Sequence, residues 1–197
     1  DKFNPEQSRG TKLALRQGSG QAPKGVKIIG VTGTRGKTTT TMMIYEILKL
    51  ALERDFLAVR LPRFSGSRTA KKTKRRVFLG GNIKDTATLP LLKEVKDGDY
   101  VVMELDSWQL QGFGDAKISP HIAVFTTFYP DHMNYYGGSM EKYFADKTNI
   151  FKYQKAGDTL VVGEQVAEKV LSAKPNVSPS VARAGDVPKD WKVKIPG

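Results

Sequence analysis

The chain of 197 residues is long enough for one substantial hydrophobic core and at most two small domains. Its 39% hydrophobic and 26% charged residues are ordinary for a globular domain, and no apolar run approaches the about 18 residues that a membrane-spanning helix needs. The absence of cysteine excludes disulfides and thiolate metal sites and fits a reducing cytoplasm, while the net charge of +12 favours anionic ligands such as nucleotides, phosphorylated substrates or nucleic acid.

Residues 1–25 are rich in Gly, Gln, Lys and Pro, and we interpret them as a linker or as the end of a preceding domain. From residue 26 onward, apolar strand-like runs alternate with helical patterns. Strands are predicted at residues 26–32, 56–61, 77–82, 99–105, 121–128 and 158–163. Helices are predicted at residues 37–55, 86–95, 138–154 (capped by Ser139) and 164–173, with short strands and turns after them. This alternation indicates βαβ units, so we expect an α/β fold with a mostly parallel sheet flanked by helices.

The segment GVTGTRGKTTT, at residues 30–40, lies between the first predicted strand and the first predicted helix. Gly33 and Gly36 allow backbone N–H groups to face a phosphate, while Lys37 adds a positive charge and Thr38 a hydroxyl for Mg²⁺. The alternative is a glycine-rich turn that starts a helix, but such a turn does not require lysine and threonine after its second glycine. The usual phosphate loop has a glycine where this chain has valine, so the sequence predicts a shortened variant of that loop.

Polar residues also follow two other buried strands, and ligands of an open parallel sheet bind where its strands end. Glu104 ends one strand, close to Asp106, and beside a phosphate loop it indicates a Mg²⁺ ligand; an ordinary strand-end acid is the alternative. His132 follows another strand, and we interpret it as a metal ligand or a phosphate contact, although a lone histidine is more often structural. His121, at the start of that strand, is interpreted as structural.

The run SRTAKKTKRR, at residues 67–76, is strongly basic. It could grip the phosphates of a nucleic acid, but no aromatic residue interleaves with its lysines and arginines to stack on bases. The sequence therefore favours a solvated loop.

These motifs, in this order, resemble those of the ATP-dependent Mur ligase family over roughly residues 26–165. VTGTRGKTTT resembles the family's short phosphate loop, GGNI its G-N-I-G segment, and ELDSWQL its E-L-S-S-F-Q-L segment. DHMNYYGGSMEKYFADKTNIF resembles a D-H-M-D stretch followed by G-S-M-E-x-Y and A-K-x-x-I-F. The resemblance implies a central ATPase domain with a P-loop NTPase-like fold. The pattern is closest to the members that add D-glutamate to UDP-N-acetylmuramoyl-L-alanine; ligases of the cyanophycin or folylpolyglutamate synthetase type, and a basic nucleic-acid-binding NTPase, are the alternatives.

The resemblance implies an enzyme in which ATP phosphorylates a substrate carboxylate and an amine then displaces phosphate from the acyl phosphate. The residues implied to cradle the ATP phosphates are Gly33, Thr34, Arg35, Gly36, Lys37, Thr38 and Thr39. The residues implied to act in catalysis are Lys37, His132 and Lys147. Thr38 and Glu104 would hold one Mg²⁺, and His132 and an N-carboxylated Lys147 a second. The positions that match residues near the carboxylate substrate, a UDP-sugar peptide, and near the ATP phosphates are Asn82, Ser107 and Gln109.

The chain departs from the family pattern at Arg35, Lys84, Asp106, Trp108, Thr127 and Asn134. The family's N-terminal domain, which grips uridine diphosphate, and its C-terminal domain lie outside the resemblance. We therefore expect residues 26–197 to be a central domain alone, monomeric and cytoplasmic, that binds Mg-ATP weakly without ligating. Neither nucleic acid nor a membrane is expected as a partner.

Overall fold

The computed structural model describes residues 25–60, 75–84 and 86–186, which contain one six-stranded sheet. Its strands are β1 (Lys27–Thr32), β2 (Val77–Gly81), β3 (Tyr100–Glu104), β4 (Ile122–Phe125), β5 (Thr159–Gly163) and β6 (Ser180–Ala182). The strands are ordered β2-β3-β1-β4-β5-β6, and every neighbouring pair is parallel. The predicted α/β class with a parallel sheet is confirmed.

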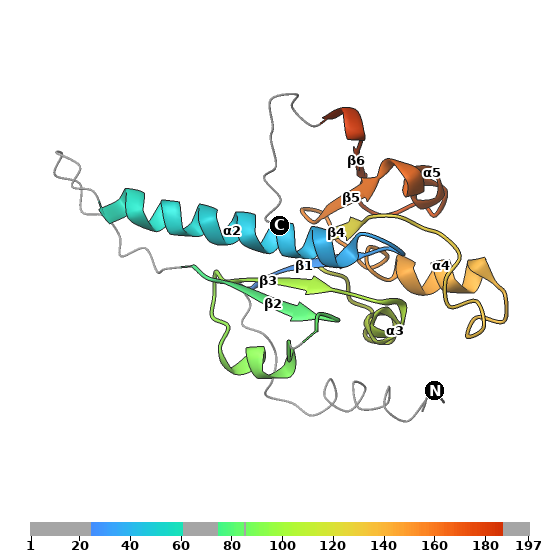
Figure 1. Cartoon of the computed structure of the whole chain (residues 1–197), viewed down its shortest axis with the longest axis horizontal. Coiled ribbons are helices and arrows are strands. Elements are labelled where there is room, and N and C mark those ends of the chain that lie inside the picture. Colours follow the sequence, from blue (N-terminus) through green and yellow to red (C-terminus); the bar gives the residue numbers. More distant parts are fainter. Residues whose placement is uncertain (1–24, 61–74, 85, 187–197) are drawn as a thin grey trace, which may run out of the picture.

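Helices cover both faces of this sheet. They are α2 (Lys37–Arg60), α3 (Ser107–Ala116), α4 (Met140–Thr148) and α5 (Glu164–Ser172), with the short 3₁₀ helices η1 (Leu89–Lys93) and η2 (Ala184–Asp186). Figure 1 shows α2 along one face, η1 and α3 on the other, and α4 near the end toward which β1 and β3 run. None of the helices in the described part of the chain is long and apolar enough to cross a membrane.

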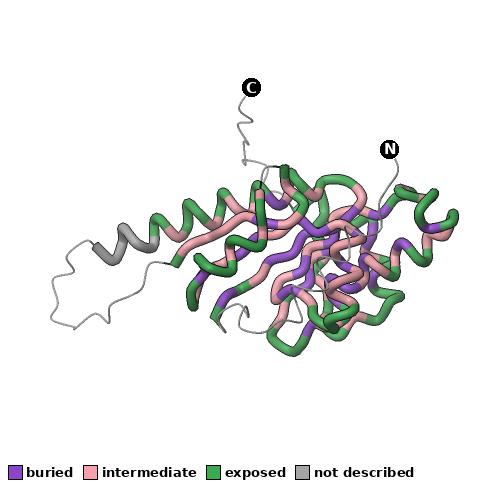
Figure 2. The backbone as a smooth tube through the Cα atoms, turned by 90° about the horizontal axis from the view of Figure 1, so that it is seen from below, coloured by how far each residue is buried: buried purple, intermediate pink, exposed green. Residues whose placement is uncertain are grey.

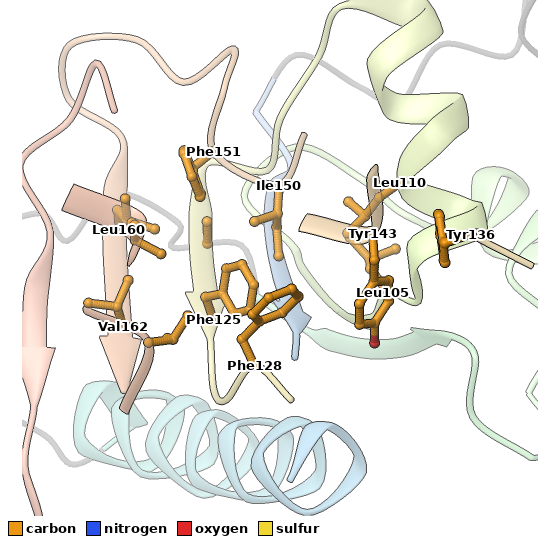
Figure 3. Packing of buried hydrophobic residues seen from close by; sticks show 13 residues of the cluster. Leu105, Leu110, Phe125, Phe128, Tyr136, Tyr143, Ile150, Phe151, Leu160 and Val162 are labelled. Carbon is orange, nitrogen blue, oxygen red and sulfur yellow. The ribbon is translucent and has the colours of Figure 1, made fainter. Parts of the chain in front are cut away.

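Buried residues concentrate in the strands, as the purple segments of Figure 2 show. The central strand β1 is buried at Ile29 and Val31, as expected for a strand covered on both faces. The main hydrophobic cluster joins β4 and β5 to α3, α4 and α5 (Figure 3). Within it, the Tyr143 ring of α4 stacks on Phe128, with 5.3 Å between ring centroids. This packing fixes α4 against the sheet edge, and it therefore fixes the position of Lys147 one turn later.

The predicted strand at residues 56–61 is wrong, because residues 56–60 are the last part of α2; residue 61 lies outside the described residues. A short apolar run does not by itself distinguish a strand from a helix. No glycine or proline interrupts the sequence between Lys37 and Pro62, so nothing there ends the helix that has already begun. The basic residues 67–74 also lie outside the described residues.

Two helix predictions need correction, and a third helix was missed. The helix expected at residues 86–95 is only the 3₁₀ turn η1, in which Pro90 supplies no N–H to an α-helical ladder. The helix expected at 138–154 is capped by Ser139, as predicted, but it ends at Thr148 and turns follow. Helix α3 was not predicted, although Asp106 and Gln109 form a capping box at its N-terminus. The spacing of those two residues was the signal that could have located it.

Candidate functional site

The loop between β1 and α2 has a backbone that only glycine adopts easily. Gly33 has φ 145° and Gly36 has φ 79°, both in the region that L-residues with a side chain rarely occupy. A Cβ atom at Gly33 would collide with Thr126 Oγ1, at the end of the neighbouring strand β4. The loop therefore lies directly on β4, and glycine at position 33 allows that approach.

Hydrogen bonds join this loop to the segment that follows β4. The N–H of Thr34 donates to the carbonyl of Thr127 (2.8 Å), and the N–H of Arg35 donates to Thr127 Oγ1 (3.0 Å). Thr126 Oγ1 donates to the Arg35 carbonyl at 2.7 Å, and Thr34 Oγ1 donates to the carbonyl of Tyr129 at 3.1 Å. The loop is thus held in shape without a bound ligand, which lowers the conformational entropy that an anion would have to remove.

The first turn of α2 presents the donors that suit an anion. The N–H groups of residues 36–39 have no recorded acceptor in the described part of the chain, as expected at a helix N-terminus. Lys37 Nζ bends back to donate to the Thr34 carbonyl at 3.1 Å, while Thr38 and Thr39 are exposed on the same turn. Because the N–H groups of Thr34 and Arg35 are already used, a phosphate would be met by the amides from Gly36 onward.

Lys147, on α4, contacts the loop between β1 and α2. Its Nζ donates to the carbonyl of Gly33 at 3.0 Å and to Thr32 Oγ1 at 3.5 Å, and it lies 4.8 Å from the centre of the Tyr143 ring. The side chain is only 2% exposed. This burial, together with the nearby charge of Lys37, lowers the pKa of Lys147 to about 7, against the opposing effect of nearby aspartates. A large fraction of this amine is therefore neutral near pH 7.

Glu104 ends β3 beside the same loop, opposite Val31 of β1 and Gly81 of β2. It is 3% exposed, and its Oε2 has no hydrogen-bond partner among the described residues. A buried carboxylate oxygen without a donor is costly unless a cation or water completes it. Within the described ranges no group of three or more Asp, Glu or His residues could hold a metal ion alone. An ion beside Glu104 would therefore also need ligands such as the Thr38 hydroxyl or phosphate oxygens.

His132 lies in the turn after β4 with φ 53°, a left-handed backbone that is uncommon for a residue with a side chain. Its N–H donates to Asp131 Oδ1 at 2.9 Å, and its Nε2 lies 3.4 Å from Asp131 Oδ2. The side chain is 41% exposed. His121 has the structural role that the sequence predicts, because its Nδ1 accepts the N–H of Ile28 at 3.1 Å, at the start of β4.

The three predicted substrate-contact residues lie beside Glu104 and in α3. Backbone or side-chain atoms of each already make contacts within the protein. Asn82 donates its backbone N–H to the Glu104 carbonyl at 2.8 Å, and its side chain is exposed. Ser107 is buried, and its hydroxyl lies close to that of Tyr136. Gln109 Oε1 accepts the N–H of Asp106 at 3.1 Å, in the capping box of α3. Contact of these residues with a substrate stays a prediction.

Arg76, the last residue of the basic run, has a structural partner. Its Nη2 lies 2.7 Å from Asp99 Oδ2, and it also donates to the Glu94 carbonyl at 2.6 Å. The Asp99 carboxylate is almost fully buried and also accepts the backbone N–H groups of Arg76 and Lys96. Arg76 therefore fastens the start of β2 to the start of β3, and its guanidinium is engaged within the fold.

The sequence matches one protein family over most of its length: the model described as the Mur ligase middle domain covers residues 31–193. The UDP-N-acetylmuramoylalanine--D-glutamate ligase of Elusimicrobium minutum is 34% identical over 77% of this chain and 29% of that protein. The ligase of the same name from Chlorobium phaeobacteroides is 39% identical over 68% of this chain and 24% of that protein. The chain thus spans about a quarter of the length of these relatives. A crystal structure of the MurF ligase of Thermotoga maritima in complex with ADP is 20% identical, with a TM-score of 0.49 over 90% of this chain and 35% of that one.

Proposed function

Because the chain belongs to the Mur ligase family, whose middle-domain model it matches over residues 31–193, we propose that it is the ATP-binding central domain of an ATP-dependent amide ligase. The names of its relatives support a role in peptidoglycan precursor synthesis, with D-glutamate added to UDP-N-acetylmuramoyl-L-alanine. The observation that carries the proposal is the meeting of three features at one sheet edge. These are a preformed phosphate loop, the orphaned Glu104 carboxylate, and the buried amine of Lys147 on the Gly33 carbonyl.

The proposed reaction has two steps. A carboxylate oxygen of the acceptor substrate attacks the γ-phosphorus of ATP, ADP leaves, and an acyl phosphate forms. The amine of the incoming amino acid then attacks the acyl carbon, loses a proton, and expels inorganic phosphate to leave an amide. Both steps move negative charge among phosphate oxygens, so they depend on fixed donors rather than on covalent chemistry by the protein.

The chain's own residues supply such donors. The N–H groups of residues 36–39 would bind the phosphate oxygens, and Lys37, released from the Thr34 carbonyl, would follow the charge of the transferring group. Thr38 and Glu104 fit as ligands of one Mg²⁺, and His132 with an N-carboxylated Lys147 is proposed for a second. A magnesium ion bound there would neutralise charge on the phosphate oxygens.

The environment of Lys147 supports its proposed modification. N-carboxylation requires the neutral amine to attack carbon dioxide and to release a proton, and burial makes the neutral form available near pH 7. The product is a carbamate anion. It replaces the buried Lys147 amine, whose lowered pKa favours the uncharged form. Mass spectrometry of the intact chain under bicarbonate, compared with carbon-dioxide-free buffer, would detect the added carboxylate.

Nucleotide binding is the direct test of the proposal. We expect isothermal titration of the chain with Mg-ATP to show binding that Lys37→Ala abolishes. Lys49→Ala is the matched control, because Lys49 is exposed on the same helix, where it pairs with Glu46 and lies over the ring of Tyr45. If Lys37→Ala binds Mg-ATP as tightly as the unchanged chain, the loop is not the phosphate site and the proposal fails.

A further inference from the structure

Trp108 packs directly against His132. The two ring centroids are 4.6 Å apart at an interplanar angle of 58°, and Tyr135 meets the indole edge-on, with 5.7 Å between the ring centroids. The neighbouring ring of Tyr143 is farther from the imidazole, at 6.3 Å. The indole is therefore the main apolar surface against which the half-exposed imidazole rests.

The two residues belong to parts of the molecule with different rigidity. Trp108 lies in the first turn of α3, which a capping box closes and whose Ser107 and Leu110 are buried. His132 lies in an exposed turn with a left-handed backbone, and its carbonyl accepts the N–H groups of Tyr135 and Tyr136. Among the described residues, the polar partner of its imidazole is the adjacent Asp131. Asp131 accepts the backbone N–H of His132 and also lies 3.4 Å from Nε2, but it is itself 44% exposed on the same turn. Packing against Trp108 is therefore the contact that ties the imidazole rotamer about χ1 to a helix of the fold.

We propose that Trp108 is a positioning residue: by packing against the imidazole it selects the rotamer of His132 seen in the structure, beside Tyr143 of the candidate site. This inference rests on the proposed function, in which His132 contacts a metal ion bound with the nucleotide. Without the indole, the imidazole gains rotamers that point into solvent, and fewer molecules present its nitrogen to an ion. Phenylalanine retains an aromatic face at this position, whereas alanine removes it.

Proton NMR of the imidazole rings tests this packing without any assay of activity. The chain has two histidines, so His132→Ala assigns both sets of signals in protein without a histidine tag. We expect the His132 signals to lie upfield of an exposed imidazole, through the ring current of Trp108. The shift should largely persist in Trp108→Phe and be lost in Trp108→Ala. His121, at the opposite end of β4, serves as the internal control and should not move.

Paramagnetic broadening then tests the positioning. With Mn²⁺ and ATP, His132 signals should broaden strongly in the unchanged chain and in Trp108→Phe, and several-fold less in Trp108→Ala; Mg²⁺ with ATP is the diamagnetic reference. Circular dichroism and the unmoved His121 signals establish that the alanine variant is folded. Unshifted His132 signals in the unchanged chain would overturn the packing, whatever the metal does. Equal broadening in all three proteins would contradict the positioning role of Trp108 alone. If the His132 signals of the unchanged chain do not broaden, both the proposed metal contact of His132 and its positioning by Trp108 are wrong.

Discussion

The lowered pKa of the buried Lys147 amine should make the stability of the protein depend on pH. The pKa of Lys147 is lowered to about 7, so between about pH 7 and 10 the unfolded chain holds a proton that the folded chain lacks. The free energy of unfolding should therefore rise with pH over that range, by up to ~1.4 kcal/mol for each unit of the pKa difference. Below about pH 7 the amine is protonated in both states, so it should cause no further change. Burial raises the pKa values of the Tyr136 and Tyr143 hydroxyls, so their ionisation affects the free energy of unfolding only at higher pH.

Replacing this amine tests that dependence. We expect Lys147→Met to be more stable than the unchanged chain at pH 7, because it removes a buried amine whose protonated form is unfavourable in the folded state. Its free energy of unfolding should no longer rise between pH 7 and 9.5. Urea titrations at each pH, in carbon-dioxide-free buffer, would measure both effects. Lys142→Met, at an exposed position on the same helix, is the control and should keep the rise. A parallel pH slope in Lys147→Met and the unchanged chain would contradict the lowered pKa.

Glu104 should separate stability from metal binding. Its Oε2 is buried without a partner, so Glu104→Gln removes an unpaired charge and should leave the metal-free melting temperature unchanged or higher. The same variant should lose the additional stabilisation that ATP gives only with Mg²⁺, measured by thermal melts with ATP in Mg²⁺ or in EDTA. Glu46→Gln, exposed on α2, should retain it. Mg²⁺-dependent stabilisation that survives in Glu104→Gln would remove this carboxylate from the site.

The loop between β1 and α2 is where backbone geometry limits substitution most. Gly33→Ala places a side chain in a glycine-only conformation, at roughly 1–3 kcal/mol, and also drives Cβ into Thr126. Gly138→Ala also has positive φ, at 79°, but its Cβ would meet nothing within 4 Å, so only backbone strain of about 1–2 kcal/mol applies. Urea unfolding should therefore rank Gly33→Ala well below Gly138→Ala in stability. Equal losses would show that the loop can move away from β4.

The starts of β2 and β3 are joined by one buried acid. Asp99 collects donors from the backbone and side chain of Arg76 and from the backbone of Lys96. Asp99→Asn should lower the free energy of unfolding by about 1–3 kcal/mol, since an amide leaves at least one of these donors poorly matched. Asp97→Asn is the control, because that exposed side chain accepts, among the described residues, a single N–H, that of Gly25, at 3.3 Å. An unchanged stability in Asp99→Asn would mean that solvent replaces the pair.

The elements that the sequence predicts well are those with a strong local signal. The continuous β-branched runs gave β1, β3 and β5, and parallel pairing followed from their alternation with helices. The end of α2 was misjudged because the short apolar run at residues 56–60 is compatible with a strand or a helix. The uninterrupted helix before it shows that these residues continue the helix. Helix α3 was missed because Asp106, its N-cap, was considered only as an acidic residue beside the Mg²⁺ candidate Glu104 and not as the start of a helix.

Contacts across the whole chain were beyond the reach of local patterns. The hydrogen bond between Lys147 and Gly33 joins residues 114 positions apart, and composition alone describes Lys147 as a solvated helix residue. Its burial depends on Tyr143 and Phe128 stacking, and so on tertiary packing. The family resemblance implied Lys147 as a site residue, but its lowered pKa and the packing of Trp108 against His132 follow only from the three-dimensional structure.

At the level of the molecule, the exposure of the site predicts how far the chain can take the reaction. Arg35, Gly36, Thr38 and Thr39 are exposed, and His132 is 41% exposed, so the described residues leave one side of a bound γ-phosphate open to water. An acyl phosphate formed there would be hydrolysed before an amine replaced it, because ligation requires an enclosed site. We expect the 197-residue chain with ATP, Mg²⁺, UDP-N-acetylmuramoyl-L-alanine and D-glutamate to release at most a little phosphate and no amide, as measured by phosphate assay and mass spectrometry. The same mixture with Lys37→Ala sets the background, and amide formed by the chain above that background would show that it needs no further domain to exclude water.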